Sequence, residues 1–184
     1  MAKAKAKAKS SSPSSSRSPD AIALLKADHR QVAGWFEEFE GTESDSKKAK
    51  LAEQICTALT VHTQIEEEIF YPAFIEATED KDMHHEAVVE HDGAKKLIAQ
   101  IQASGPKDEY FDAKVKVLSE MIKHHVKEEE QPGGMFAEAR GAEMDLKVLG
   151  EQMAARKQEL MGAATKPGGL RSMIAKAVGM ADAR

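Results

Sequence analysis

Apolar side chains recur at intervals of three and four residues through most of this chain, and no segment shows the strict alternation of a half-buried strand. This periodicity predicts four long helices and two later helical segments, at about 19–39, 46–78, 82–103, 108–131, 143–161 and after Gly169. The loops between the long helices are short. We therefore expect an all-α fold, an antiparallel up-down four-helix bundle with additional C-terminal helices.

Capping and helix-breaking residues set the expected helix boundaries. Ser18-Pro19-Asp20 predicts the first helix start, with serine as N-cap and proline at the first helical position. Pro72 predicts a kink or a break within the second helix, because proline has no N–H and its ring collides with the preceding turn. Pro132-Gly133-Gly134 is expected to end the fourth helix.

The N-terminal segment differs from the rest of the chain in composition. Residues 1–18 are almost entirely lysine, alanine and serine, with five basic residues and no acidic one, so we expect a disordered basic tail. The remainder is acidic, which argues against broad nucleic-acid binding, and only the tail has the sign for weak phosphate contact. The expected organisation is the tail at 1–18, the bundle with its following helix at 19–161, and a short helical extension at 162–184.

Several classes of protein are excluded by simple counts. The 184 residues suit one ordinary domain. The single cysteine, Cys56, excludes an internal disulfide and a cysteine-rich metal site. No stretch approaches the ~20 consecutive apolar residues that span a bilayer, and the first residues lack the apolar core of a secretory signal. We therefore expect a cytoplasmic protein without a membrane partner.

Two of the predicted helices carry the same short motif, a histidine followed four residues later by a glutamate. The pairs are His62 with Glu66 and His125 with Glu129. Residues at this spacing lie one turn apart on one helix face, so an imidazole nitrogen and a carboxylate oxygen can meet at one cation. One such motif arises easily by chance in a charged helix, and a solvated charged face is the alternative interpretation.

The phase of these residues relative to the apolar side chains favours a buried site. At ~100° per residue, His62 and Glu66 fall within the apolar stripe of the second helix, and His125 and Glu129 fall within that of the fourth. His29 is flanked by apolar residues of the first helix, and His91 shares a face with alanines and Ile98 of the third. Buried glutamate is rare unless it is paired or binds metal.

The positions also agree along the bundle axis. At ~1.5 Å per residue, antiparallel packing brings the four histidines within about two turns of one height. We therefore expect four imidazoles and two carboxylates to converge inside the bundle. Such a set suits iron, manganese or zinc, and two carboxylates from opposite helices could bridge two ions ~3.5–4 Å apart.

Leu25-Lys26-Ala27-Asp28-His29-Arg30, the two H-x-x-x-E-E motifs, Phe70-Tyr71-Pro72 and Glu90-His91 together resemble the hemerythrin-like, HHE cation-binding domains of bacterial type. The resemblance covers about 20–160. It implies a non-haem di-iron centre with carboxylate bridges and two iron ions per chain. The ligands it implicates are His29, His62, Glu66, His91, His125 and Glu129. Oxygen-carrying members have a fifth histidine one turn before the third-helix ligand, where this chain has Ala87.

The resemblance implies a protein that binds iron and a small ligand such as oxygen, nitric oxide or peroxide, for sensing, storage or scavenging. Alanine at position 87 leaves a coordination position open, to be filled by water, Glu90 or another carboxylate, and favours reaction over simple reversible carriage. Two alternatives remain at this point: a redox enzyme that consumes peroxide at the di-iron centre, and a structural bundle with a vacant or zinc-filled site. The sequence does not specify an oligomeric state.

Other polar residues near these motifs have plainer interpretations. His84 and His85 lie near a helix start, and His124 lies ~100° off the ligand face, so we expect all three in solvent. Asp28 and Glu90 either support the neighbouring histidines or lie on the surface. The adjacent acids are expected to form a solvated face, with a supporting or additional ligand role as the alternative, namely Glu67, Glu68 and Glu130. Tyr71 is expected to pack, with a hydrogen bond near a bound ligand as its alternative role.

Overall fold

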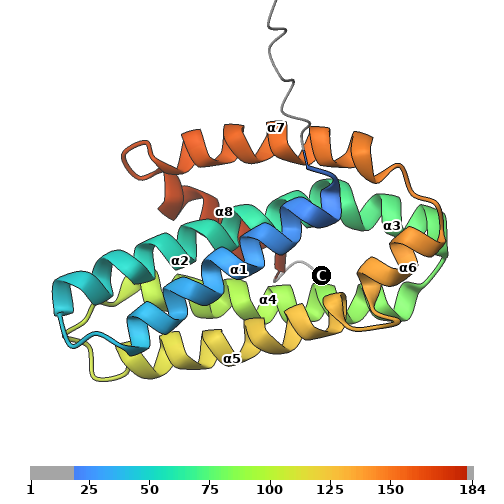
Figure 1. The fold of residues 1–184 in the computed structure, drawn as a ribbon. Coiled ribbons are helices and arrows are strands. Elements are labelled where there is room, and N and C mark those ends of the chain that lie inside the picture. Colours follow the sequence, from blue (N-terminus) through green and yellow to red (C-terminus); the bar gives the residue numbers. More distant parts are fainter. Residues whose placement is uncertain (1–18, 182–184) are drawn as a thin grey trace, which may run out of the picture.

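Within residues 19–181, which this computed structural model describes, the chain forms eight α-helices, one π-helical segment and no strand (Figure 1). In chain order they are α1 (Ala21–Glu40), α2 (Asp45–Ile65), η1 (Glu66–Phe70), α3 (Tyr71–Thr78), α4 (Lys81–Ala103), α5 (Phe111–Glu130), α6 (Met135–Gly141), α7 (Leu146–Ala164) and α8 (Gly169–Ala181). The tail expected at 1–18 lies outside the described residues. Within residues 19–181 we find no helical stretch that combines the length and the hydropathy of a membrane span.

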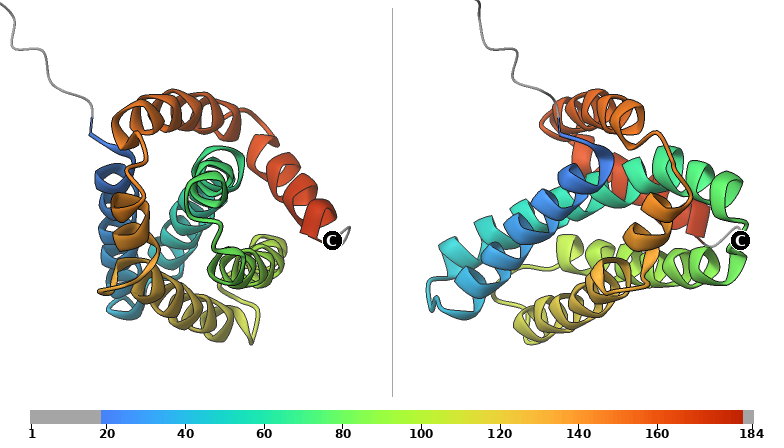
Figure 2. Two further views of the ribbon diagram at one scale, coloured as in Figure 1. Left: turned by 90° about the vertical axis from the view of Figure 1, so that its right-hand side faces the viewer. Right: turned by 45° about the vertical axis from the view of Figure 1, so that its right-hand side comes forward.

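Helices α1, α2, α4 and α5 form the bundle. α1 packs against α2 and α5, and α4 packs against the same two helices, so the four close into a square. Seen along the bundle (Figure 2, left), they surround one shared interior. Each bundle helix runs opposite to the one before it (Figure 1). The expected all-α, antiparallel up-down four-helix bundle with additional C-terminal helices is confirmed.

Two hydrophobic clusters fill the bundle, one toward each end. The first includes Val32 of α1 and Leu59 of α2, and reaches the loops after α1 and α4. The second includes Leu25 of α1 and Ile65 of α2, and continues to Phe74 of α3. The change from one cluster to the other therefore falls in the middle of the helices. Buried polar side chains lie at this level, described below.

The second expected helix continues past Pro72 without a break. α2 passes into η1, where the Tyr71 N–H bonds to the Glu66 carbonyl five residues earlier, and then into α3. A π turn is wider than an α turn, so it makes room for the proline ring directly after it. The extra residue in this turn also brings Glu66, Phe70 and Tyr71 to buried positions together. The kink or break expected at Pro72 is thus replaced by a π-helical segment.

Two features of the boundaries differ from expectation. Asp20, not Ser18, is the N-cap of α1, and its carboxylate accepts a hydrogen bond of 2.7 Å from the Ala23 N–H. α6 follows the end of α5 directly and was not expected from the periodicity. The chain turns between them at Gly134, where a Cβ atom would lie 2.1 Å from the Glu128 carbonyl oxygen, so only glycine fits.

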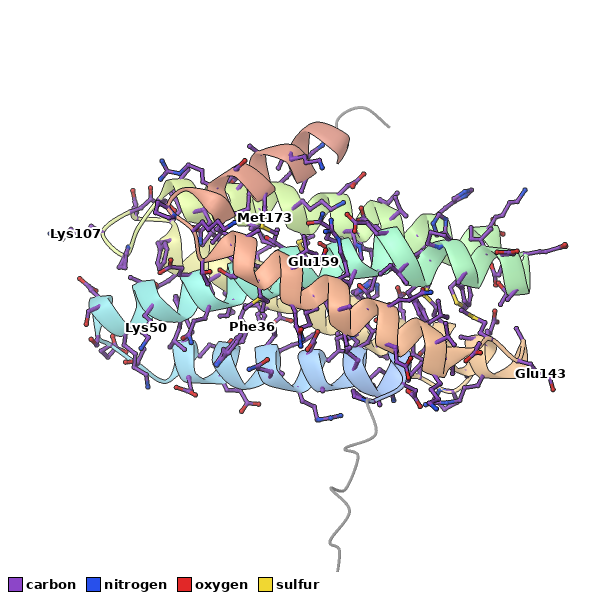
Figure 3. All side chains as sticks on the ribbon, turned by 90° about the horizontal axis from the view of Figure 1, so that it is seen from above. Phe36, Lys50, Lys107, Glu143, Glu159 and Met173 are labelled. Atoms are coloured by element: carbon purple, nitrogen blue, oxygen red, sulfur yellow. The ribbon has the colours of Figure 1, made fainter. Side chains whose placement is uncertain are left out.

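α7 and α8 form a layer outside the bundle. α7 lies across α1 and α2, as the view from above shows (Figure 3), and α8 packs against α4. Gly150 allows the close approach of α7, because a Cβ atom there would lie 2.5 Å from the Pro19 carbonyl oxygen. Lys157 of α7 forms an ion pair with Asp28 of α1. The outer layer therefore reaches the middle level of the bundle.

Candidate metal centre

The structure brings all six predicted ligands together at the middle level of the bundle, where all are buried. The histidines form two pairs whose Nε2 atoms face each other. His29 Nε2 of α1 lies 3.1 Å from His62 Nε2 of α2, and His91 Nε2 of α4 lies 3.2 Å from His125 Nε2 of α5. The phase and the axial level read from the sequence thus correspond to a real convergence of side chains.

The two glutamates lie between the histidine pairs. Glu66 Oε2 is 3.2 Å from His62 Nε2 and 3.4 Å from His91 Nε2. Glu129 reaches the other member of each pair, with Oε2 3.4 Å from His29 Nε2 and Oε1 3.6 Å from His125 Nε2. Each carboxylate therefore faces both pairs. The arrangement contains two sets of two imidazoles that share two carboxylates.

The carboxylates of Glu66 and Glu129 are fully enclosed, and none of their four oxygens accepts a hydrogen bond from the described residues. Burial, together with the neighbouring Glu129, raises the pKa of Glu66 well above its usual range, and burial raises the pKa of Glu129. Two unpartnered acids at this depth are costly unless a cation lies between them. The donor set therefore fits a bound metal.

Burial favours the neutral form of two of the four histidines. Burial lowers the pKa of His29 to about 3 and that of His91 to about 3. Burial also lowers the pKa of His125, but Glu129 and Glu90 outweigh it and the net shift is upward. Metal binding requires an imidazole without its second proton, so the low values favour coordination.

Each of these histidines also faces a carboxylate with its other nitrogen, Nδ1. An Nδ1–H that donates to a carboxylate fixes the tautomer, and Nε2 is then left as the acceptor that points into the bundle. The four pairs are His29 with Glu130 (2.7 Å), His62 with Asp28 (3.5 Å), His91 with Glu67 (3.0 Å) and His125 with Glu90 (2.7 Å).

We call the four carboxylates that contact Nδ1 atoms the outer carboxylates, namely Asp28, Glu67, Glu90 and Glu130. Three of them are paired with lysines. The pairs are Glu130 with Lys26, Glu67 with Lys95, and Asp28 with Lys157. Burial raises the pKa of Glu67, but His91 and Lys95 outweigh it and hold the pKa at about 2. The fourth carboxylate, Glu90, faces His124 instead, at 3.5 Å. Burial likewise raises the pKa of Asp28 and of Glu130, but their histidine and lysine partners outweigh it and hold both pKa values below their usual range.

Tyr71 packs in the interior as expected, and two of the acids contact the buried histidines, which was their alternative interpretation. The Tyr71 hydroxyl lies 3.1 Å from His91 Nε2, and its ring is buried against His91 and His84. Glu67 and Glu130 contact histidines instead of forming only a solvated face. Their place in the sequence could have indicated these contacts, because each acid directly follows a predicted ligand.

Two cavities touch this cluster from different sides. A small cavity of about 10 Å³ lies against all four histidines and is otherwise lined mainly by apolar side chains, such as Val32, Leu59 and Ile122. A larger cavity of about 330 Å³ reaches His125 and Glu129, and Ala87 forms part of its wall. The position of the family's fifth histidine is therefore at the edge of open space.

The other candidate residues lie apart from this cluster or on its rim. His124 is exposed, as expected, and lies 3.1 Å from Glu128. His85 is also exposed, whereas His84 is half-buried against Tyr71. Cys56 is buried, and burial raises the pKa of its thiol to about 12, which argues against a nucleophilic role.

Comparison with known families agrees with this geometry. The model of the family described as "Hemerythrin HHE cation binding domain" matches residues 20–132. The chain belongs to the hemerythrin HHE cation-binding domain family. The resemblance inferred from the sequence motifs is confirmed, and the protein is a helical bundle of a cation-binding family.

One solved structure and one protein sequence are similar to this chain. A crystal structure of a hemerythrin HHE cation binding domain-containing protein from Mycobacterium kansasii matches 86% of this chain and 99% of that chain, with a TM-score of 0.66 and 24% identity. This likeness shows the fold alone. A protein described as a DNA nickase from Nostoc sp. is 30% identical over 117 residues, which are 64% of this chain. The match spans 32% of the nickase, about a third of its length.

Proposed function

We propose that this protein binds two iron ions in the middle of the bundle, together with a small ligand such as oxygen, nitric oxide or peroxide that it senses, stores or scavenges. The observation that carries the proposal is the pair of enclosed carboxylates, Glu66 and Glu129, without hydrogen-bond partners between two pairs of imidazole nitrogens. His29 and His62 would hold one ion and His91 and His125 the other, with both glutamates shared. Zinc or manganese suits the same ligand types.

The chain's own side chains limit what reaches the ions. Bound iron would supply a redox-active Lewis acid that can take up oxygen, nitric oxide or peroxide. The cavity of about 10 Å³ beside the histidines is no larger than a water molecule needs and is mostly apolar, so it favours a diatomic ligand over a larger substrate. The Tyr71 hydroxyl lies 3.1 Å from His91 Nε2, so its O–H reaches the edge of the proposed iron site.

An optical experiment tests binding of a small ligand. Iron-loaded protein should show a charge-transfer band, and the band should change when oxygen or nitric oxide is added to an anaerobic sample. The same band should be absent from His91→Ala, because that variant loses one imidazole of the cluster. A wild-type spectrum that is indifferent to both gases would refute the small-ligand function while leaving metal binding intact.

A second candidate is an enzyme that consumes peroxide at the same centre. The larger cavity favours it, because this space reaches His125 and Glu129 beside Ala87 and admits a reactant from outside. Rapid peroxide turnover that is lost in His125→Ala would support the enzyme. Slow turnover in both proteins would leave the binding function as the better description. Protein grown with iron but free of any metal would favour a purely structural bundle.

DNA nicking, the activity that the Nostoc relative is named for, has less support in this chain. The formal net charge is -5, and an acidic surface repels nucleic-acid phosphates. Weak contact between nucleic acid and the basic segment 1–18 stays a prediction, as does a cytoplasmic location. Retention on DNA that is lost when this segment is removed would support the first of these predictions.

A further inference from the structure

The larger cavity described above forms a cleft between α4 and α5, next to the start of α6. It has a volume of about 330 Å³ and extends from the surface to Glu129, which is 2% exposed. His125 forms another part of its inner end. The cleft therefore joins solvent to two of the residues that we propose as iron ligands.

The lining of this cleft is strongly acidic. Five carboxylates line it between the surface and Glu129, namely Asp80, Asp82, Glu86, Glu90 and Glu128. Among the described residues that line it there is no lysine or arginine. A cleft lined by one sign of charge focuses the field and raises the local concentration of the opposite ion. This lining attracts cations and repels anions.

A group of cation-binding side chains stands at the side of the cleft. His124 Nε2 lies 3.1 Å from Glu128 Oε1 and 3.5 Å from Glu90 Oε1. One ligand atom from each of the three residues lies within 4.8 Å of the others. One imidazole with two carboxylates is a suitable ligand set for a divalent transition metal. His124 is exposed, so an ion can reach this group from solvent.

This outer group is connected to the buried cluster by a shared residue. Glu90 faces His124 with one oxygen, while its other oxygen accepts a hydrogen bond of 2.7 Å from His125 Nδ1. Further in, the oxygens of Glu129 lack hydrogen-bond partners at the inner end of the cleft. One turn before His91 on α4, the cleft is lined by Ala87, whose side chain is only a methyl group.

We propose that this acidic cleft is the access route by which divalent cations reach the buried site, and that Glu90, His124 and Glu128 form an outer site that holds a cation before it passes to Glu129. The proposal rests on the proposed function, since it requires a metal to occupy the buried ligands. The small cavity on the other side is a poor route for a hydrated ion, because its lining is largely apolar.

Cobalt uptake by the full chain tests the route. Metal-free protein is mixed rapidly with Co²⁺, and the visible absorption of bound cobalt is followed over time. In the double variant His124→Gln/Glu128→Gln we expect uptake about tenfold slower than in wild type, together with loss of a weakly bound extra equivalent at equilibrium. Glu120→Gln is the matched control, because Glu120 is an exposed acid on the same helix outside the cleft, and it should load at the wild-type rate.

Two further measurements separate charge from shape. The difference between wild type and the double variant should shrink as salt is added, because screening weakens attraction to the acidic lining. Ala87→Leu narrows the cleft without changing its charge, so it should slow uptake at every salt concentration. Circular dichroism and thermal unfolding of each metal-free variant show whether slow uptake reflects a folding defect.

The outcomes distinguish this proposal from the function on which it rests. Equal uptake rates in wild type and the double variant, with the same number of weakly bound ions, would overturn the access route and leave the buried site intact. A wild-type chain that takes up no cobalt and no iron would overturn both. Slow uptake in the double variant and in Ala87→Leu, with normal uptake in Glu120→Gln, is the result that the proposal requires.

Discussion

The outer carboxylates around the buried histidines form a closed ring through the four helices. Asp28 of α1 contacts His62 of α2, and Glu67 of η1 contacts His91 of α4. Glu90 of α4 and Glu130 of α5 continue the ring, to His125 of α5 and His29 of α1. A residue next to a ligand is rotated by ~100° and so points toward the neighbouring helix. Each helix therefore supplies a carboxylate that contacts a buried histidine of the next.

This ring predicts a measurable effect on metal affinity. Glu130→Ala leaves the Nδ1–H of His29 without its partner, so the ring of His29 is less well oriented and less basic. We expect affinity to fall by about 10–100-fold, the usual effect of removing such a partner. Competition against a chelator of known affinity measures the change.

The control for this experiment is Glu120→Ala, which removes an exposed acid of the same helix and should leave affinity unchanged. Unchanged affinity in Glu130→Ala as well would mean that the carboxylate ring is only a surface ion-pair network.

The convergence of the six candidate ligands could be predicted from the sequence because each is marked by its phase on a single helix. Their partners were harder to find, since a contact such as Glu130 with His29 depends on how two helices are rotated against each other. The position of a residue around its own helix does not specify how two helices are rotated against each other. Tyr71 packs in the interior as expected, and its contact with His91 Nε2 depends in addition on the π turn before it, which shifts its direction relative to an ordinary helix.

At the level of elements, the π-helical segment η1 is the feature that joins the site to the fold. It begins at Glu66 and ends next to Tyr71, so the irregular turn lies within the candidate site. π turns are rare and often occur at functional sites. Periodicity alone predicted a continuous helix here and could not show the extra residue.

The docking of α7 on the bundle predicts opposite effects for two glycines of that helix. Gly150→Val should destabilise the protein by about 1–3 kcal/mol, because its side chain would collide with the backbone at Pro19 and Asp20. Gly162→Ala meets no atom within 4 Å, so it should stabilise by about 0.5–1 kcal/mol through helix propensity. Urea unfolding of the metal-free variants measures both.

Equal effects of the two substitutions would contradict close packing of α7 on the start of α1. If Gly150→Val loses stability but Gly162→Ala gains none, only the expected stabilisation through helix propensity at position 162 is contradicted.

The sequence pattern did not predict the short elements. α6 has seven residues, too few for a periodic pattern to stand out, although Met135, Phe136 and Ala139 are all buried. The start of α1 was misplaced because serine, proline and aspartate in succession offer two possible N-caps. The long helices were predicted well because their apolar stripes extend over several turns.

For the whole molecule, burial of the polar layer lowers the free energy of unfolding, and a bound metal would offset this loss. The two hydrophobic clusters meet at a level that contains four imidazoles and two unpartnered carboxylates. Without a cation, burial in this dry interior raises the pKa of both Glu66 and Glu129, and the neighbouring Glu129 adds to the upward shift of Glu66. The bundle is therefore expected to depend on metal for part of its stability.

Metal removal should lower the thermal midpoint of the protein. A ligand present at a hundred times its Kd adds about 2.7 kcal/mol, which for a chain of this size corresponds to about 5–10 °C. Calorimetry with and without a chelator measures the difference. An identical midpoint in both samples would show that no metal binds preferentially to the folded state.

The most direct test of the account is the metal content of protein produced with iron, measured by elemental analysis for wild type, Glu66→Ala and Glu68→Ala. Glu68 is the matched control, because it lies two residues away and pairs with Arg156 at the surface. We predict two iron ions per chain in wild type and in Glu68→Ala, and loss of both in Glu66→Ala. Full iron content in a folded Glu66→Ala variant would contradict it.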